Sequence, residues 1–420
     1  MSIRDWLGRS ALAGLCLTSA TWAADPAFVP PPQGLGLAQL VDLAWARSAE
    51  AGGVEAQRAL LAARDLAAAS LFPGPPSVGL DLRQGLPASL APAGTGRAST
   101  SGLMEIDTGV AAPLWLPGQQ RATAAVLAAE RARLEAQLRR QRWQLAGELR
   151  EAVWALDQAQ TQFTVQTDRL ELAEKLEADV VRRVQAGERA PVDQMLAAAD
   201  RAQAQSALQE AQLQALGAAS RLARLSGVDA MGPIAESPAL AADVDTHPAL
   251  VAARAALALA TARLEAVRAT PRDAPTVSVV ARLERDALSG DARNSVRMGV
   301  SVPLDTEARQ APRLAAALSE QVDAELAWAR ERRLLEVEQS QARQVLEATE
   351  GLLERAEERL TLARAAQQAL ERAFAAGERG LPEVLRARQA TLDAQLAVAS
   401  ARSTRGRAIA RYNQSLGVEP

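Results

Sequence analysis

The chain has 420 residues, of which 48% are apolar, 23% are charged and only 3% are aromatic. Alanine, leucine, arginine and glutamate dominate, which is typical of long helices rather than of a mixed globular core. The formal net charge of -3 and the lack of a basic tail give no indication of nucleic-acid binding, and most charges are interpreted as solvated helix faces.

The first 23 residues have the pattern of a secretory signal peptide. Arg4 and Arg9 precede an apolar run over 11–17, and small residues lead to a predicted cleavage site after Ala23. A buried N-terminal helix is the alternative interpretation. The run is short for such a helix and is followed by an extended proline-rich segment, 24–36, so we expect an exported protein.

The only cysteine, Cys16, would leave with the signal peptide. Leu15 stands where a lipoprotein cleavage site needs a small residue, so no lipid anchor is predicted. Without cysteine, the mature chain forms no disulfide and offers no thiolate to a metal. No run of about 18 apolar residues follows the signal, so no membrane-spanning helix is predicted, whereas a closed β-barrel would still allow membrane insertion.

The two halves of the chain repeat each other in sequence. Residues 186–189, Ala-Gly-Glu-Arg, recur at 376–379, an offset of 190, and upstream the offset becomes 199. We place the difference in a hairpin loop that is longer in the first repeat, 85–102, than in the second, 287–294. The predicted organisation is a first repeat, a linker and a second repeat, at 37–227, 228–246 and 247–418.

Each repeat holds a predicted pair of strands in which apolar and polar residues alternate, as in Val78, Leu80 and Leu82. An ordinary half-buried sheet would show the same alternation, but the rest of the chain offers no globular domain for it to cover. Open strand edges are not tolerated in lipid, so the subunit is expected to associate with copies of itself. The four strands are expected at about 77–85, 102–114, 276–286 and 295–304.

Long helices make up the remainder. No proline interrupts 119–186, which at ~1.5 Å per residue predicts a helix of roughly 100 Å. Leucines spaced mainly by seven and four predict coiled-coil-like packing between helices in both repeats. One short helix and one intermediate helix, stacked end to end, come close to one long helix. These shorter helices are expected at 49–70, 192–225, 248–270 and 382–416.

This duplicated order of helix, strand pair, long helix, turn and returning helix resembles the TolC family of outer-membrane efflux channels over about 37–418. The similarity is greatest to the heavy-metal efflux branch, the CzcC-like channels, through residues 275–303. Residues 48–50, Ser-Ala-Glu, depart from the Asn-Pro pair usual in the first repeat. Specific matches to the family lie at 183–188, 225–227, 247–250 and 303–304.

The resemblance implies an α+β, predominantly α fold. Four strands per chain would join a shared β-barrel in the outer membrane, and long antiparallel helices would form a barrel across the periplasm. It also implies a homotrimer that contacts outer-membrane lipid, a periplasmic adaptor and an inner-membrane pump of the RND type. The implied function is passive export of divalent heavy-metal cations or, alternatively, of drugs or other small molecules, with no enzyme activity.

The narrow end of the implied tunnel would lie at the two Ala-Gly-Glu-Arg turns. Glycine permits the tight reversal, and exposed loop tips would be the surface offered to an adaptor. Asp193 and Glu383 could ring the aperture and favour cations. The adjacent Pro191 and Pro382 favour another interpretation, acidic charge at a helix N-terminus. The predicted adaptor-binding residues are Gly187, Glu188, Arg189, Gly377, Glu378 and Arg379.

No pattern of catalytic, metal-binding or cofactor-binding residues is found in the sequence. The only histidine, His247, precedes Pro248 and is interpreted as a helix-start residue. The scattered methionines predict no soft-metal site. Two other classes have long helices: a periplasmic adaptor, which would show one hairpin between β-rich halves rather than a twofold repeat, and a soluble helical scaffold without a pore.

Overall fold

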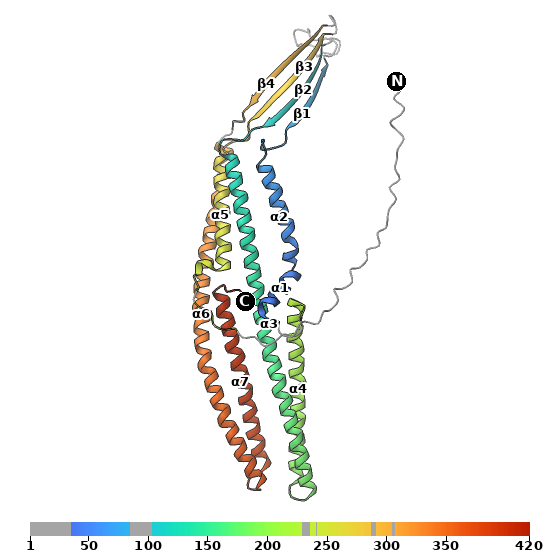
Figure 1. Ribbon diagram of the computed structural model, residues 1–420, viewed down its shortest axis with the longest axis vertical. Helices are drawn as coiled ribbons and strands as arrows, with labels where there is room; N and C mark the ends of the chain where they lie inside the picture. The colour runs from blue at the N-terminus through green and yellow to red at the C-terminus, as the bar shows by residue number, and fades with distance from the viewer. Residues whose placement is uncertain (1–34, 85–102, 229–235, 241, 287–290, 305–306) are drawn as a thin grey trace, which may run out of the picture.

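The computed structural model describes residues 35–84, 103–228, 236–240, 242–286, 291–304 and 307–420. They form a long rod with a sheet at one end and helices along the rest (Figure 1). The predicted signal peptide and the predicted first-repeat hairpin loop lie outside the described residues.

Seven α-helices contain most of the described residues. The predicted helix over 119–186 agrees with α3 to within one residue. A short helix, α1, was not predicted. It ends before Ser48, whose extended backbone separates it from α2 and whose Oγ accepts the Ala51 N–H over 3.2 Å. The helices are α1 (Leu37–Arg47), α2 (Ala49–Ala68), α3 (Gln119–Gln185), α4 (Pro191–Ser226), α5 (Pro248–Ala269), α6 (Glu307–Ala375) and α7 (Leu381–Ser415).

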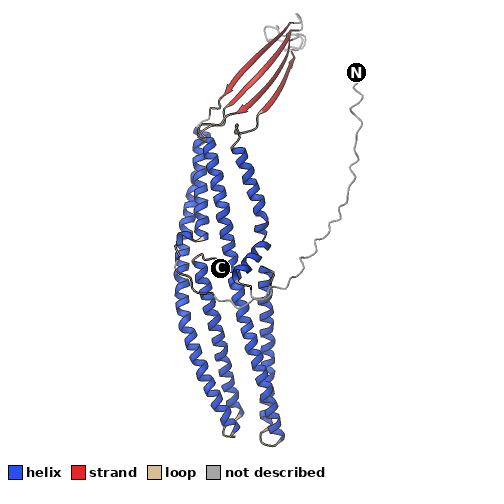
Figure 2. Cartoon of the chain, in the orientation of Figure 1, coloured by secondary structure: helices blue, strands red, loops and turns tan. Residues whose placement is uncertain are grey.

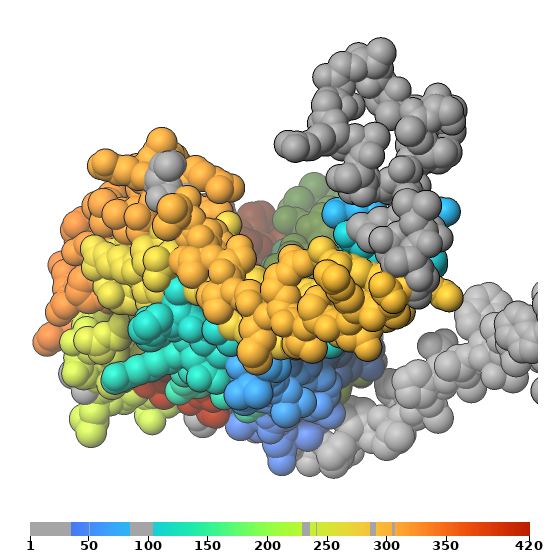
Figure 3. Space-filling model, turned by 90° about the horizontal axis from the view of Figure 1, so that it is seen from above, coloured from blue at the N-terminus to red at the C-terminus, as the bar shows by residue number. Residues whose placement is uncertain are grey.

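The helices form a wall of four columns, shown in Figure 2. Near the sheet, contacts run from α2 to α3, then to α5 and α6; near the far end they run from α4 to α3, then to α7 and α6. Two columns are therefore the single long helices α3 and α6. The other two are stacks of two shorter helices, α2 with α4 and α5 with α7. Seen from above, α6, α5, α3 and α2 follow an arc (Figure 3). Among the described residues, α6 contacts neither α2 nor α4, so the wall has two open edges.

Both stacked columns are joined in the same way at the middle of the rod, which we call the equator. Gly227, with φ of 80°, ends α4, and a Cβ there would lie 3.0 Å from the guanidinium carbon of Arg47. Gly417, with φ of 75°, follows α7, and its Cβ would lie 2.7 Å from Cδ of Pro248 at the start of α5. These left-handed glycines end one helix where the next begins, as the predicted stacking requires.

The four strands form one antiparallel sheet in the order β1-β2-β3-β4. The β2–β3 pair joins the two repeats, with Thr108 opposite Ala281, and it leaves β1 and β4 as open edges. No described helix covers either face (Figure 1). The strands are β1 (Ser77–Gln84), β2 (Leu103–Pro113), β3 (Thr276–Asp286) and β4 (Ala292–Ser301).

The predicted bounds of β4, 295–304, were wrong by three residues at each end. Pairing begins earlier because Arg293 lies opposite Glu284 and Asn294 opposite Leu283, which extends the ladder beyond the apolar alternation. It ends at Ser301, two residues before Pro303, whose ring nitrogen carries no N–H for a ladder. The apolar periodicity located the strand, and polar cross-strand partners set its ends.

The core is divided into small clusters along the rod. The largest lies at the equator, where Leu40 and Val41 of α1 pack against Leu149 and Leu156 of α3 and Leu222 of α4. Of the positions on α3 predicted to pack between helices, Leu127, Leu149 and Leu156 are buried, whereas Phe163 remains 36% exposed. None of the helices in the described part of the chain has an apolar stretch able to cross a membrane.

Candidate functional site

The two Ala-Gly-Glu-Arg turns lie at the end of the rod opposite the sheet and share one geometry. Gly187 and Gly377 have φ of 75° and 78°, a region that glycine adopts without a steric penalty. The next residue, Glu188 or Glu378, donates its backbone N–H over 2.9 Å to a carbonyl of the preceding helix. Both glutamates are exposed, so the turns present carboxylates to solvent.

Arg189 fastens the first turn to the second repeat. Its Nη2 donates to the carbonyl of Phe374 over 3.0 Å, and its guanidinium carbon lies 4.1 Å from the centre of the Phe374 ring. Phe374 is buried with Leu381 and Val384. A cation above an aromatic face is attracted by the ring quadrupole, so this contact holds the two tips of one chain together.

Arg379 has the equivalent place in the second turn but stays within its own repeat. Its Nη1 lies 3.4 Å from Oε1 of Glu383 on the first turn of α7. The difference arises because Phe374 stands where the first repeat has Val184, so only one turn has an aromatic ring opposite it. Of the residues predicted to bind an adaptor, Arg189 is thus occupied by an internal contact, whereas Arg379 is exposed.

Asp193 and Glu383 lie in the first turns of α4 and α7. Carboxylates at this position stabilise the helix dipole, which fits the interpretation that Pro191 and Pro382 favoured. An acidic ring around an aperture would be a property of an assembly, and it stays a prediction.

The apolar face of the sheet is fully presented to the surroundings. Cross-strand pairing brings Val78 opposite Val110, Val110 opposite Val279, and Val279 opposite Met298. Val78 and Met298 are 77% and 79% exposed. A contiguous apolar surface of this kind marks a site of contact with lipid or protein.

The opposite face of the sheet carries an ion-pair network around Arg282. Its guanidinium donates to both carboxylate oxygens of Asp107 over 2.8 and 2.7 Å. Glu284 and Glu105 lie 3.6 and 3.8 Å from its Nη1. Because Arg282 is on β3 and Asp107 on β2, the network crosses the strand pair that joins the repeats.

At the equator, Arg150 of α3 is almost completely buried, with 3% exposed. It donates to Glu236 of the linker over 3.0 Å, to Gln414 over 2.6 Å and to the carbonyl of Val418 over 3.2 Å. Nearby, Asn413 donates to the carbonyl of Ser237 and accepts the N–H of Ala239. The linker and the C-terminal segment are therefore both tied to the helical wall here.

His247 is fully buried at the start of α5, where its Nδ1 accepts the Ala249 N–H over 3.2 Å. Its ring meets Trp143 edge to face, at 4.7 Å between ring centres. Burial lowers the pKa of His247. The predicted role at a helix start agrees with this geometry. The described ranges contain no group of three or more His, Cys, Asp or Glu side chains arranged to hold a metal ion.

Sequence analysis did not identify the side chains that connect the repeats. Departures from the repeat were an available signal for some of them, although Arg189 has an identical counterpart in Arg379. Arg150 corresponds to Ser340, and Phe374 to Val184.

No protein-family model and no curated protein matches the sequence, but solved structures match its fold. The outer membrane protein VceC of Vibrio cholerae is 17% identical, with a TM-score of 0.71 over 91% of this chain and 96% of that one. The outer membrane channel CmeC of Campylobacter jejuni is 15% identical, with a TM-score of 0.70 over 91% and 85%. The outer-membrane channel OprN is 23% identical, with a TM-score of 0.72 over 91% and 90%. The chain therefore has the fold of these outer-membrane channels, as its resemblance to the TolC family predicted.

Proposed function

We propose that the chain is the outer-membrane channel subunit of a tripartite, RND-type efflux system and acts as a passive conduit from the periplasm to the exterior. One observation carries the proposal. The sheet has an exposed apolar face and two open edges, and it continues into a helical wall that is open on the same two sides. The shared fold with solved outer-membrane channels supports it.

The open edges of the sheet and the wall belong together. Strand β1 follows α2, which forms one edge of the wall, and strand β4 precedes α6, which forms the other. One edge of a copy can therefore meet the opposite edge of the next along the whole rod. Such head-to-tail contacts close into a ring when the rotation between copies permits, and the TolC resemblance suggests a homotrimer.

The two faces of the sheet suit a barrel wall in a membrane. Val78, Leu80 and Met298 would face lipid, and the network around Arg282 would face a water-filled interior. Backbone groups at the edges would be paired between copies, which removes the cost of leaving them unpaired in lipid. This arrangement places the sheet in the outer membrane and the helices in the periplasm.

The edge helix α6 supports contact between copies. Several of its large apolar side chains are exposed, and three follow one another at intervals of four residues, which places them on one helix face. A neighbouring copy that packs α2 and α4 against this face would cover them. The exposed apolar residues of α6 are Leu318, Val322, Leu326, Leu334, Val337, Val345, Leu352 and Leu362.

The tips are proposed as the surface for a periplasmic adaptor, which would connect the channel to an inner-membrane pump. Glu188, Glu378 and Arg379 are exposed at the end of the rod. A partner there would gain access to backbone groups of the two turns as well as to these charges. Asp193 and Glu383 are proposed to contribute negative charge near the aperture.

Divalent heavy-metal cations are the first cargo to test, because residues 275–303 are most similar to the heavy-metal branch. Drugs or other small organic molecules are the second. A strain lacking the gene, challenged with cobalt, zinc and cadmium and separately with drugs, distinguishes them. Unchanged sensitivity to all three metals would argue against the first.

Membrane fractionation of cells that produce the full chain tests the channel itself. The proposal expects recovery in the outer membrane as a heat-resistant trimer that conducts ions in a planar bilayer. A monomer in the soluble periplasmic fraction would instead favour an adaptor or a helical scaffold.

A further inference from the structure

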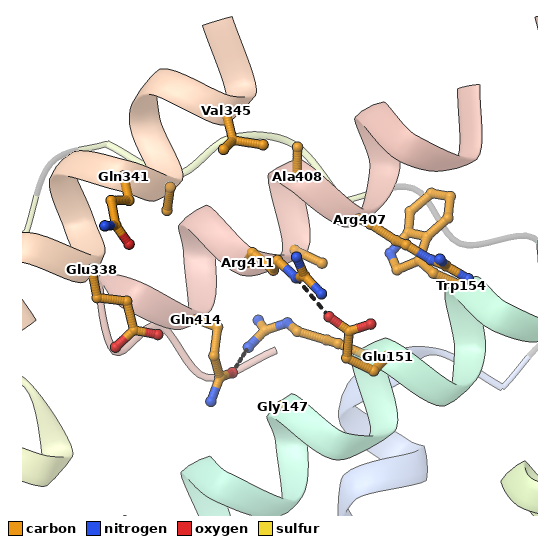
Figure 4. A pocket seen from close by; sticks show the side chains of 13 residues that line it. Gly147, Glu151, Trp154, Glu338, Gln341, Val345, Arg407, Ala408, Arg411 and Gln414 are labelled. Carbon is orange, nitrogen blue, oxygen red and sulfur yellow. Dashed lines mark hydrogen bonds and ion pairs between the residues drawn. The ribbon is translucent and has the colours of Figure 1, made fainter. Parts of the chain in front are cut away.

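A cavity of about 440 Å³ opens between α3, α6 and α7 at the equator (Figure 4). Small side chains create it, because Gly147, Ala342 and Ala408 line it where larger residues would fill the space. The indole of Trp154 and the side chain of Val345 add flat and branched apolar surface. Its volume lies within the range of sites that hold small organic molecules.

Three arginines line this cavity, and two of them already have partners. Arg150 donates to Gln414 over 2.6 Å, and Arg411 donates to Glu151 over 2.8 Å. In contrast, Nε of Arg407 is buried and has no hydrogen-bond partner among the described residues, and the charge of this arginine interacts with Asp157 without a hydrogen bond. No protein acceptor reaches this donor, so an anionic group bound in the cavity could accept its hydrogen bond.

The cavity lies on the face of α3 opposite α1, and Arg150 extends from the cavity lining to Glu236 of the linker. Along α3, Leu149, Val153 and Leu156 pack with α1, whereas Gly147 and Trp154 line the cavity. At 3.6 residues per turn these two sets point in nearly opposite directions. In Figure 4 the blue ribbon of α1 lies behind α3 as the cavity is viewed.

Helix α7 repeats this division. Arg407 and Arg411 line the cavity, while Asn413 holds the backbone of the linker at 237–239. Copies that close into a tube would have its interior obstructed by α1 and the linker if these segments lay inside it. They are therefore placed on the outer surface, and the cavity faces the interior through which cargo would pass.

We infer that this equatorial cavity binds organic cargo with a flat apolar body and an anionic group, the ring resting against Trp154 and the anion meeting Arg407. This inference rests on the proposed channel function and specifies a substrate class for it. The positive charge of Arg407 would disfavour a bare metal cation beside it.

Naphthalene-2-sulfonate is a suitable probe. Isothermal titration calorimetry of the full-length assembly in lipid nanodiscs is expected to give one site per chain. Arg407→Gln should weaken binding by about tenfold, the usual size of a lost charge-assisted hydrogen bond. Arg405→Gln is the matched control, because Arg405 is two residues away on the same helix and outside the cavity lining, so its affinity should equal that of the unaltered protein.

A second probe and a second variant separate charge from shape. Naphthalene-2-methanol, which carries no anion, should bind the unaltered protein and Arg407→Gln equally. Ala342→Phe should abolish binding of both probes by filling the cavity, with an unchanged circular dichroism spectrum and oligomer size. Equal affinity of the sulfonate for Arg407→Gln and the unaltered protein would overturn the inference.

Planar-bilayer conductance of the same preparation keeps the two proposals apart. Protein that conducts ions but shows no binding of either probe at millimolar concentration would refute the cavity site and leave the channel intact. Protein that binds the sulfonate through Arg407 but forms no conducting oligomer would refute the channel, and with it the assignment of the ligand as cargo.

Discussion

Trp154 of α3 packs directly over Gly406 of α7, so closely that a Cβ built on Gly406 would overlap the six-membered ring of the indole. The two residues stand at a close approach of two long helices from different repeats. The first repeat has Leu216 in place of Gly406 and the second has Gln344 in place of Trp154, so the contact occurs once per chain.

Gly406→Ala should destabilise the chain, because the added methyl group forces the indole out of its position. We expect a loss of about 1–3 kcal/mol in the free energy of unfolding. Gly217→Ala is the control, since Gly217 lies within α4 with no atom within 4 Å of its Cβ position, and it should stabilise by ~0.5–1 kcal/mol. Thermal denaturation followed by circular dichroism measures both, and equal stability of the two variants would contradict the contact.

Arg150→Met should be strongly destabilising, by about 3–5 kcal/mol, because it leaves the carboxylate of Glu236 without its buried partner. Adding Glu236→Gln should recover part of the loss, because the uncompensated charge is then removed. Denaturant unfolding of the two variants provides the comparison. If the double variant is no more stable than the single one, the ion pair is not what Arg150 contributes.

Stability should fall in mildly acidic solution because of His247. Its pKa in the folded chain is lowered by burial, whereas in the unfolded chain it has the ordinary value of about 6.5. The unfolded chain therefore binds more protons below about pH 6.5, and stability present above that pH is lost as the pH falls toward the folded pKa.

His247→Asn retains a side-chain acceptor for the N-terminus of α5 but does not titrate. The melting temperature of this variant should change less between pH 7.5 and pH 5.5 than that of the unaltered chain. An identical pH slope in both proteins would show that another group is responsible.

Arg189→Ala should loosen the tips, because it removes both the hydrogen bond to the Phe374 carbonyl and the contact with its ring. A cation–π contact of this kind contributes about 1 kcal/mol. Spin labels at positions 188 and 378 should report a broader distance distribution in this variant. Arg379→Ala is its control, since it loses only a surface ion pair with Glu383, and an equally broad distribution there would rule out a special role for Arg189.

Val296→Arg and Ser295→Arg test which face of the sheet contacts lipid. Val296 lies on the apolar face, and an arginine there would cost about 2–4 kcal/mol near the middle of a membrane. Ser295 is the next residue on β4 and points to the face that carries Arg282. The first variant should lose recovery as an outer-membrane oligomer, and the second should keep it. The reverse result would exchange the two faces.

Much of the fold followed from the sequence because both repeats carry strong periodic signals. The uninterrupted heptad-like segment fixed α3 to within one residue, and period-two alternation located all four strands. The helix α1 was missed because it ends at Ser48 through an extended residue, without the glycine that follows α3, α4, α6 and α7. The ends of β4 were misplaced because charged and amide side chains continue its pairing.

The candidate site was predicted less completely. A tight reversal between two helices favours glycine at positive φ, and this reasoning located Gly187 and Gly377 in the turns. The partner of Arg189 could not be inferred, because it depends on how the second repeat packs beside the first. The cavity beside Trp154 was also missed, because the alanine and glycine residues that line it come from separate helices and form no sequence pattern.

The joints at Gly227 and Gly417 give the rod an uneven stiffness. α3 and α6 cross the equator as continuous helices, so they act as rigid struts between the tips and the sheet. The other two columns are interrupted at mid-length, because α4 and α7 end at left-handed glycines and the backbone does not continue from α4 into α2 or from α7 into α5. A sideways load on the tips would therefore be carried across the equator mainly by α3 and α6, and the stacked columns would resist it only through packing.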